Sequence, residues 1–421
     1  MIPVIPDLAE RPTHVPVGQV FDFDVYRFPV VDGEFQSALL QLRRQEVPEV
    51  FWTPRNGGHW VVTRARDVQM VLETPDIFSS RKSSVPKALA PNPPLPPIQS
   101  DPPEHAQYRQ LLTDTFSPRS VRRLEEAARA LTIKLIDGFE PNGACEFIGE
   151  FATHLPIEIF MSIVDLPPSD RLGLLEISEA CMRPRKPEDR VNGFATLSRY
   201  AREKIRERRE KPGNDLISTV IAAEVNGQSL SDDTITNIIT LVLTAGLDTV
   251  ASMLGFVVHF LAHNDEHRRQ LVAKPALIPR AAEEMLRRFA IATLAREVSE
   301  EVTLGQARLL PGDMVVVPTM LGNLDEEIFD EPLTVDFQRQ IKSHYTFGAG
   351  PHRCIGSNLA RAELKIFLEE WLSRIPDFAV CPNAMIEVNK RVVATMSALP
   401  LCWTPRNEQN KIDTAKAAYG R

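Results

Sequence analysis

The feature that most constrains this chain is an apolar run that begins after Ser231 and ends near Ala262. Roughly thirty residues in an α-helix span roughly 45 Å. The stretch IITLVLTAGLDTVASMLGFVVHFLA is apolar on almost every side, and such a helix is buried all round. Asp232 and Asp233 supply first-turn acids after Ser231, a good N-cap. We therefore expect one long helix that crosses the middle of the fold.

A membrane-spanning helix is the alternative, and Asp248 at the centre of the run argues against it, because a charge inside a bilayer is costly. Thr240, Thr244 and Asp248 recur every four residues, which predicts a polar seam on one face. Threonines bonded to backbone carbonyls and a paired aspartate would explain that seam without a function. Gly246 favours a functional role, since glycine inside a helix costs about 1 kcal/mol relative to alanine and something must approach the backbone there.

Composition excludes several classes of protein. The 421 residues are 43% hydrophobic and 25% charged, which is typical of a soluble chain. A net charge of -8 supplies no general attraction for nucleic acid. The five cysteines are scattered and contain no C-x-x-C, so neither a disulfide framework nor a zinc site is indicated. The N-terminus has no basic start followed by an apolar run, and we expect a cytoplasmic protein.

Prolines, 34 in all, cluster in residues 85–103, where helix is excluded. This long loop is either a solvated linker or a lid over an apolar pocket. Elsewhere the spacing predicts mostly helices and a few short strands, in one mainly α fold with no repeat and no domain linker. Helices are expected from Asp101 and Ser117 onward and at 146–165, 168–181 and 187–211, and strands at 50–53, 59–63, 296–298 and 313–317.

The strongest functional signal is YTFGAGPHRCIG, residues 345–356, which places one cysteine, Cys354, just before a helix-forming run. Unpaired N–H groups at a helix start favour the thiolate form of a cysteine, and flanking glycines let a flat partner approach closely. The loop closely resembles the haem-binding loop of the cytochrome P450 superfamily. The positions that carry this resemblance are Phe347, Gly348, Gly350, His352, Cys354 and Gly356.

Three further motifs match the family in the right order. AGLDT at 245–249 matches its oxygen-activating element, Glu284 and Arg287 match its E-x-x-R pair, and Arg339 resembles the arginine that joins this pair. Stretches such as DPPEHAQYR and LARAEL are similar to the soluble bacterial camphor hydroxylase group from about residue 20 to Trp403. The resemblance implies a single domain over residues 1–421, a triangular helical prism whose long central helix lies over haem.

The resemblance also implies a cofactor, haem b, with O2 as co-substrate and Cys354 as the axial ligand of the iron. Thr249 would hydrogen-bond dioxygen, and Asp248 would help to deliver protons. Phe347 and Gly348 lie in the haem loop, and Ala245 and Gly246 would meet the opposite face of the haem, where glycine leaves room for dioxygen. The haem propionates would be bound by basic side chains at Arg109, His105, Arg296 and His352.

The expected substrate pocket differs from that of the camphor-binding member in one contact. The camphor-binding member uses a tyrosine in the loop equivalent to residues 85–100, and this loop has none, while Leu294 replaces an aspartate near a propionate. By resemblance the pocket is nearly all apolar, which selects by shape and suits a small cyclic terpenoid such as cineole, camphor or an ionone. The expected pocket residues are Leu95, Ile98, Leu241, Thr244, Ala292, Val392 and Val393.

The implied activity is therefore that of a monooxygenase that takes electrons from a [2Fe-2S] ferredoxin with a separate reductase. We expect a monomer that binds neither nucleic acid nor membrane. The alternatives are a peroxide-using relative, which would lack the acid–alcohol pair, and a haem sensor without catalysis. The ferredoxin is expected on the face of the cysteine loop, although a solvated helix face would also explain its basic residues, which are Lys342, Arg353, Arg361, Lys365 and Arg109.

Overall fold

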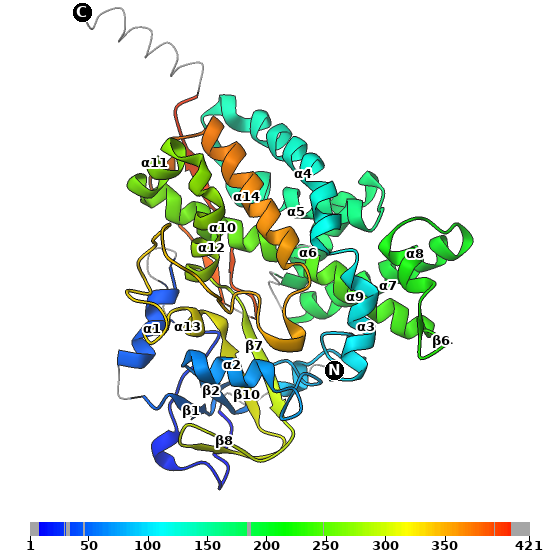
Figure 1. Ribbon diagram of the computed structural model, residues 1–421, viewed down its shortest axis with the longest axis vertical. Helices are drawn as coiled ribbons and strands as arrows, with labels where there is room; N and C mark the ends of the chain where they lie inside the picture. The colour runs from blue at the N-terminus through cyan, green and yellow to red at the C-terminus, as the bar shows by residue number, and fades with distance from the viewer. Residues whose placement is uncertain are drawn as a thin grey trace, which may run out of the picture.

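The computed structural model describes residues 8–28, 30, 34–44, 47–182, 187–246, 248–390 and 392–405. Helices make up most of the regular structure, and the strands of the largest sheet lie together at one end of the molecule (Figure 1). The α-helices are α1 (Gln36–Arg44), α2 (Ala65–Glu73), α3 (Glu104–Thr113), α4 (Pro118–Phe139), α5 (His154–Ile163), α6 (Arg171–Met182), α7 (Pro187–Glu210), α8 (Leu216–Ile221), α9 (Asp232–Gly246), α10 (Thr249–His263), α11 (Asp265–Ala273), α12 (Ile278–Arg288), α13 (Thr319–Asn323) and α14 (Ser357–Arg374).

The largest sheet has five strands in the order β1-β2-β10-β7-β3, with β2 and β10 parallel and the other neighbours antiparallel. Its strands β1, β2 and β10 are buried along their whole length, so their apolar sequences need not alternate. The four predicted strands are confirmed. The strands are β1 (Val50–Thr53), β2 (His59–Val62), β3 (Phe78–Ser79), β4 (Ala144–Glu146), β5 (Glu224–Val225), β6 (Gln228–Ser229), β7 (Thr293–Val298), β8 (Val302–Leu304), β9 (Ala307–Leu309), β10 (Met314–Pro318), β11 (Ala379–Val380), β12 (Val388–Asn389), β13 (Thr395–Met396) and β14 (Pro400–Cys402).

The predicted N-cap is present at the start of α4 but not at the start of α3. The hydroxyl of Ser117 accepts a hydrogen bond from the backbone N–H of Ser120, and Pro118 occupies the first turn of α4, as predicted. Asp101 does not cap α3, which begins at Glu104. Its carboxylate instead accepts hydrogen bonds from Ser79 Oγ at 2.6 Å and other groups of the preceding segment, so it fixes the start of the proline-rich loop.

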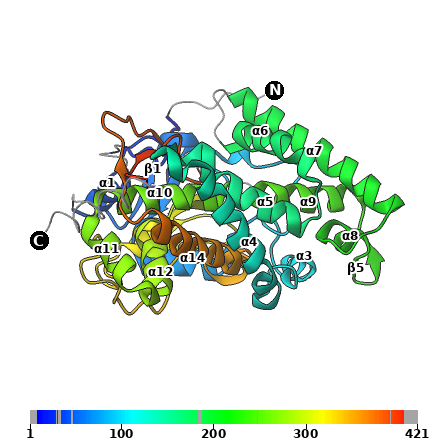
Figure 2. The same ribbon diagram turned by 90° about the horizontal axis from the view of Figure 1, so that it is seen from above.

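The apolar central run is buried in the middle of the protein. Figure 2 shows α9 and α10 end to end across the molecule, with α6 and α7 on one side and α12 and α14 on the other. Among the described residues, the helical stretch Asp232–His263 is long and apolar enough to cross a membrane, and 65% of its most apolar part is buried inside the protein. Burial against other helices therefore accounts for its composition.

The prediction of one unbroken helix is wrong near its centre. Helix α9 ends at Gly246 and α10 begins at Thr249, while Leu247 lies outside the described residues. Asp248 has a φ of -141° and a ψ of -23°, which is not helical. Thr240 and Thr244 lie one turn apart on α9, as the expected polar seam requires, whereas the break takes Asp248 out of the regular helical spacing.

Candidate functional site

The cysteine loop packs tightly against the end of α2 before the chain enters α14. Gly348 and Gly350 have φ angles of 68° and 64°, a backbone conformation that favours glycine. A Cβ on Gly350 would lie 2.4 Å from the carbonyl oxygen of Leu72. The backbone N–H of Cys354 donates to the carbonyl of Phe347 at 2.8 Å, which closes the loop. The position of Cys354 is therefore fixed by the backbone rather than by side-chain packing.

The thiol of Cys354 does not favour the thiolate form by itself. Burial among protein atoms is the largest influence and raises its pKa, whereas a hydrogen bond from Gly356 and the charges of Arg109, Arg361 and Arg353 lower it. The balance in the chain alone is a raised pKa, although the residue itself is exposed. A bound metal cation would reverse this balance, because a coordinating thiol loses its proton.

Arg361 supports the cysteine loop from α14. Its guanidinium forms an ion pair with Glu283, with an Nε–Oε1 distance of 2.5 Å, and lies 4.5 Å from the ring centroid of Phe347. Burial raises the pKa of Glu283, but hydrogen bonds from His344 and Arg361 outweigh burial and hold that pKa at about 2. Arg361 therefore packs against the cysteine loop. This contact corrects the expectation that Arg361 is a free charge on the ferredoxin face.

The break in the central helix coincides with a close contact to α5. A Cβ on Gly246 would lie 2.3 Å from the ring of Phe160, which is buried. Something does approach the backbone at this glycine, as the sequence predicts, but it is a phenylalanine of the protein. The room left by the missing side chain is thus filled by Phe160, which corrects the expectation that it holds dioxygen.

Asp248 and Thr249 form the start of α10. The Asp248 side chain is 0% exposed, and its Oδ2 accepts a hydrogen bond from Ser252 Oγ at 3.0 Å. Thr249 Oγ1 donates to the carbonyl of Ala245 at 3.2 Å across the break. The Ser252 contact was not predicted, although its position four residues after Asp248 on a helix gives a signal that sequence reasoning could have used.

One strip of the central helix is accessible although its neighbours are buried. Leu241, Thr244, Ala245 and Thr249 are exposed or half-buried, while Val242 is buried. The spacing of three and four residues from Leu241 puts Thr244 and Ala245 on one face of α9, and the hydrogen bond from Thr249 to the Ala245 carbonyl brings Thr249 beside them. The Thr244 hydroxyl bonds to the carbonyl of Thr240 at 2.8 Å, so it is a backbone-bonded threonine in this structure. The strip presents methyl and isopropyl groups with two hydroxyls.

Arg296 on β7 is a buried cation that forms no ion pair with a carboxylate of the described residues. Its side chain is nearly inaccessible, and its Nη1 donates to the carbonyl of Ala295 at 2.8 Å. Burial lowers its pKa to about 10, against the opposing influence of Asp101. A buried guanidinium without an anion is costly, so this position calls for a negatively charged group.

Three other basic side chains gather around Arg296. The rings of His105 and His352 lie 4.1 Å apart, and His352 Nε2 is buried without a partner among the described residues. Burial first, then the charges of Arg296, His105 and Arg109, lower the pKa of His352 to about 3. Arg109 donates to the carbonyl of Arg353 at 2.6 Å and so joins this cluster to the cysteine loop. The structure thus brings the four predicted basic residues together.

Glu284, Arg287 and Arg339 form one buried network. Arg287 donates to both carboxylate oxygens of Glu284 at 2.8 Å, and Arg339 Nε donates to Glu284 Oε1 at 3.1 Å. Arg287 and Glu284 are both almost fully buried. Arg287 Nη1 also donates to the carbonyl of Asn323 at 2.9 Å, which connects the network to the chain that leads into the cysteine loop.

The sequence model of the family described as Cytochrome P450 matches residues 181–274 and 276–392. "Probable cytochrome P450 127A1" of Sinorhizobium fredii is 34% identical over 378 residues, which is 88% of this chain and 91% of that protein. The chain belongs to the cytochrome P450 family. Two crystal structures of P450s are similar to it, CYP101J2 with a TM-score of 0.87 and 38% identity and CYP101C1 with 0.86 and 33%, each covering 94% of this chain and all of the other.

Membership of this family identifies the cofactor as haem b, the co-substrate as O2 and the enzyme as a haem-thiolate monooxygenase. When bound, haem iron with a thiolate ligand activates dioxygen so that one oxygen atom enters the substrate. The residues of this P450 fit such a group. Cys354 offers one accessible sulfur, and the unpaired cation of Arg296 with His352 suits the anionic propionates.

The expected pocket residues are brought together in part. Val393 forms a β-bridge with Ala292, and the N–H of Thr293 donates to the carbonyl of Val392 at 2.8 Å, so these residues meet at one edge of the fold. Leu95 is buried in the proline-rich loop. Ile98 is 47% exposed, and its assignment to the pocket wall stays a prediction.

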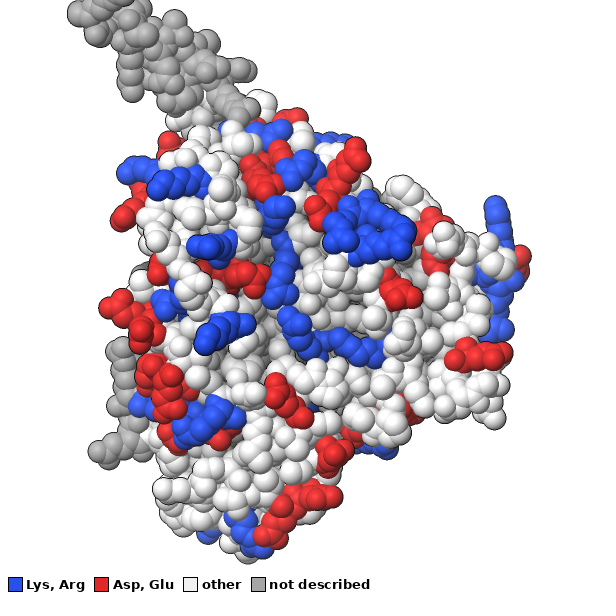
Figure 3. Space-filling model, in the orientation of Figure 1, with Lys and Arg blue, Asp and Glu red and all other residues white. Residues whose placement is uncertain are grey.

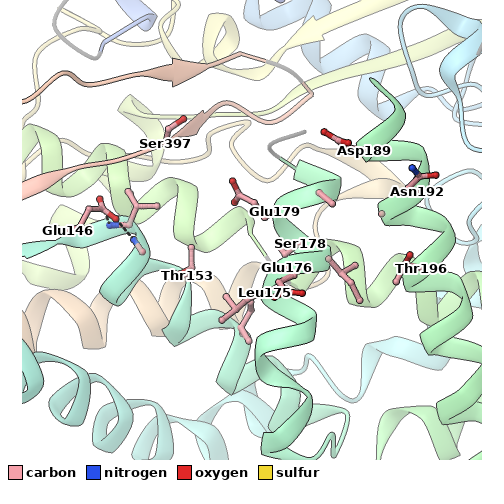
Figure 4. Close-up of a pocket in the computed structure, with 16 residues that line it drawn as sticks. Glu146, Thr153, Leu175, Glu176, Ser178, Glu179, Asp189, Asn192, Thr196 and Ser397 are labelled. Carbon is pink, nitrogen blue, oxygen red and sulfur yellow. Dashed lines mark hydrogen bonds between the residues drawn. The ribbon is translucent and has the colours of Figure 1, made fainter. Parts of the chain in front are cut away.

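Two cavities lie apart from the cysteine loop. The larger, about 700 Å³, lies between η5 (Ile148–Ala152), α5, α6 and α7 and contains the side chains of Glu146, Glu176 and Glu179 (Figure 4). The other, about 400 Å³, is bounded by the proline-rich loop, α3 and α9. The loop therefore lines a cavity, but side chains such as Arg81, Lys82 and Gln99 beside the prolines give that cavity a mixed rather than an apolar lining.

Proposed function

We propose that this P450 hydroxylates a small apolar cyclic terpenoid, with O2 and with electrons from a [2Fe-2S] ferredoxin and its reductase. The accessible strip of the central helix carries this proposal, because a substrate beside it would meet mainly aliphatic groups of Leu241 and Ala245. We also propose that residues 1–421 form a single haem-thiolate domain that acts in the cytoplasm as a monomer. Such a chain has no need of a membrane or nucleic-acid partner.

The roles of the site residues follow from their positions. Cys354 would hold the haem iron through its sulfur, and Phe347 and Gly348 shape the loop that presents it. Arg109, His105, Arg296 and His352 bind the propionates, a role supported by the cluster of these basic side chains around the buried Arg296. Ala245 lies at the accessible end of α9, and the Gly246 backbone contributes the break that exposes Thr249.

Thr249 holds a proton on Oγ1 at the accessible face, and Asp248 is the buried acid beside it. We predict that Thr249→Ala leaves the substrate-induced spectral shift largely unchanged but diverts electrons to hydrogen peroxide, by tenfold or more, because a hydrogen-bond donor near dioxygen is lost. Product and peroxide formed per NAD(P)H consumed measure this directly.

The matched control for that variant is Thr236→Ala. Thr236 bonds to the carbonyl of Asp232 in the same way, yet it is buried near the opposite end of α9. It should couple electrons to product as the natural protein does. Equal coupling in the Thr249 and Thr236 variants would show that Thr249 is only a helix residue and would remove it from the proton pathway.

The substrate class is argued from the pocket chemistry. Leu95, Leu241, Ala292, Val392 and Val393 are aliphatic and at least half-buried. Burial of apolar area contributes roughly 25 cal/mol per Å², so a compact hydrocarbon gains most of its affinity by shape. The proline-rich loop offers no tyrosine to hold a ketone, and Thr244 is bonded to its own helix.

The experiment is a spectral titration of the holoenzyme with cineole, an ionone, camphor and a steroid, followed by turnover with ferredoxin. A compact cyclic ether or hydrocarbon should bind at least as tightly as camphor and give a hydroxylated product. Much tighter binding of camphor than of the other terpenoids would refute the absence of a polar anchor and point to Thr244. Turnover with peroxide but not with ferredoxin would favour the peroxide-using alternative, and binding without any product would favour a sensor.

We propose that the electron donor binds to the face that carries α14, α4 and the cysteine loop. Figure 3 shows Lys and Arg side chains gathered over these elements. Arg361 and Lys365 pair with Glu283 and Glu369 at 2.5 and 3.9 Å. Other basic side chains on this face are exposed and form no ion pair with a carboxylate of the described residues. These are Arg119, Arg122, Arg123, Lys342 and Arg353.

We predict that Arg122→Glu slows ferredoxin-driven reduction severalfold and weakens its dependence on salt, because a basic face steers an acidic partner. Arg206→Glu, an equal charge change at an exposed position of α7 on another side of the molecule, is the control (Figure 2). Stopped-flow reduction at several salt concentrations gives the rates. Identical rates and salt dependence in both variants would place the donor on a different face.

A further inference from the structure

Three of the five cysteines lie in or beside one small sheet, outside the cysteine loop. The strand order is β11-β14-β4, with Cys402 on β14 and Cys145 on β4. Cys145 is paired with Leu401, the neighbour of Cys402, so the alternation of a strand places Cys145 and Cys402 on opposite faces. Cys145 is buried, whereas Cys402 is partly exposed.

Cys381 lies beside Cys402 on the outer face. Ala379 is directly opposite Cys402, and Cys381 follows Ala379 by two residues, so both thiols point to the same side. The backbone N–H of Cys381 donates to the carbonyl of Pro400 at 2.9 Å, which continues the pairing past the end of β11. The two thiols are in hydrogen-bond contact, and both are partly exposed.

We propose that Cys381 and Cys402 are a modification site that forms a reversible disulfide when this protein meets hydrogen peroxide. The sulfur of Cys402 attacks the O–O bond, and the products are a sulfenic acid and water. The sulfur of Cys381 then displaces the hydroxyl as a second water and forms the S–S bond. Two thiols lose two electrons, and one peroxide is reduced to two waters.

The thiolate is the nucleophile in such reactions. Burial and the contact with Cys402 raise the pKa of Cys381 to about 11, so its thiolate is scarce at neutral pH and the oxidation should be faster in alkaline buffer. Because Cys381 follows the last residue of β11, a small backbone shift there brings the sulfurs to the bonding distance of about 2 Å.

The bond would close a segment that contributes to the substrate pocket. Residues 382–401 contain β12 and β13 and, between these strands, Val392 and Val393. The tip of this segment is already held, since the N–H of Ala394 donates to the carbonyl of Ile291 at 2.9 Å. A cross-link at its base restricts the unfolded chain, so the oxidised protein should unfold at a higher temperature than the reduced protein.

The test is peptide mapping of the holoenzyme after treatment with a small excess of hydrogen peroxide and quenching with catalase. Trypsin separates the two cysteines into residues 375–390 and 392–406, so the disulfide appears as a joined pair that dithiothreitol splits. Thiols titrated after denaturation should fall from the five of the sequence to three. The thermal midpoint should rise and should return on reduction.

Cys402→Ser and Cys381→Ser should each abolish the joined peptide and the rise in midpoint, whereas Cys145→Ser, at the buried cysteine of the same sheet, should keep both. Two serine variants guard against one that folds poorly. Oxidation of either thiol to a sulfinic acid without a joined peptide would overturn the proposal. So would thiols that remain unchanged under conditions that oxidise free glutathione completely.

Discussion

Replacement of Cys354 by histidine should abolish the red-shifted band of the reduced carbon monoxide complex together with all ferredoxin-driven hydroxylation. The band depends on sulfur as the ligand opposite carbon monoxide, and imidazole does not supply the electron density of a thiolate. The loop that presents residue 354 is fixed by Gly348, Gly350 and the hydrogen bond to Phe347, so the backbone should survive the change. Absorption spectra and product analysis measure both effects.

Cys381→His is the matched control, since it makes the same substitution at a partly exposed thiol outside the cysteine loop. This variant should keep the band and the activity of the natural protein. A Cys354→His protein that kept the band would require another thiolate ligand and would remove Cys354 from the site. Loss of haem content from the Cys354 variant, measured by the pyridine haemochrome, would still agree with its role as the ligand.

The cysteine loop and the E-x-x-R network were predictable because their motifs resemble those of the cytochrome P450 family, and the residue types in these motifs are tied to local geometry. Gly350 is required by the carbonyl of Leu72, and Glu284 and Arg287 are one helical turn apart on α12. The buried strands were also predictable, since β1, β2 and β10 are short runs of β-branched and aromatic residues. In each case a few adjacent residues contain the information.

The features that sequence reasoning missed depend on contacts between distant segments. The break between Gly246 and Thr249 arises beside Phe160, which is more than eighty residues earlier in the chain. Arg361 was expected among the basic residues of the ferredoxin face, or on a solvated helix face, but Glu283 of α12 pairs with it. Neither Phe160 nor Glu283 lies in a sequence motif that predicts its contact, so only the tertiary structure reveals these two contacts.

The E-x-x-R network and the cysteine loop, which were predicted separately, are connected by hydrogen bonds. Arg287 donates to the carbonyl of Asn323, and the Asn323 side chain donates to Thr346 Oγ1 at 2.9 Å. Thr346 in turn donates to the carbonyl of Leu286 at 2.6 Å, which returns to α12. The buried network of α12 therefore holds the first residues of the cysteine loop. This arrangement explains why a network remote from the accessible strip matters for the cofactor.

Arg287→Leu should destabilise the protein by about 3–5 kcal/mol, because it leaves the buried Glu284 carboxylate without its main partner. That loss is a large share of the stability of a typical protein, so the variant should accumulate poorly and bind haem weakly. Denaturant unfolding and haem content per chain measure the two effects. Arg280→Leu, at an exposed position on the same helix, should change either quantity little.

The double variant Glu284→Gln with Arg287→Leu separates a buried charge from lost packing. Removing the carboxylate's charge should restore part of the stability that Arg287→Leu alone loses, since the remaining amide is neutral. Arg339→Leu leaves the pair of Glu284 and Arg287 intact and should cost less than Arg287→Leu. If Arg287→Leu lowered stability and haem content no more than Arg280→Leu, the network would not support the cysteine loop. The hydrogen bonds through Asn323 and Thr346 would then not stabilise that loop.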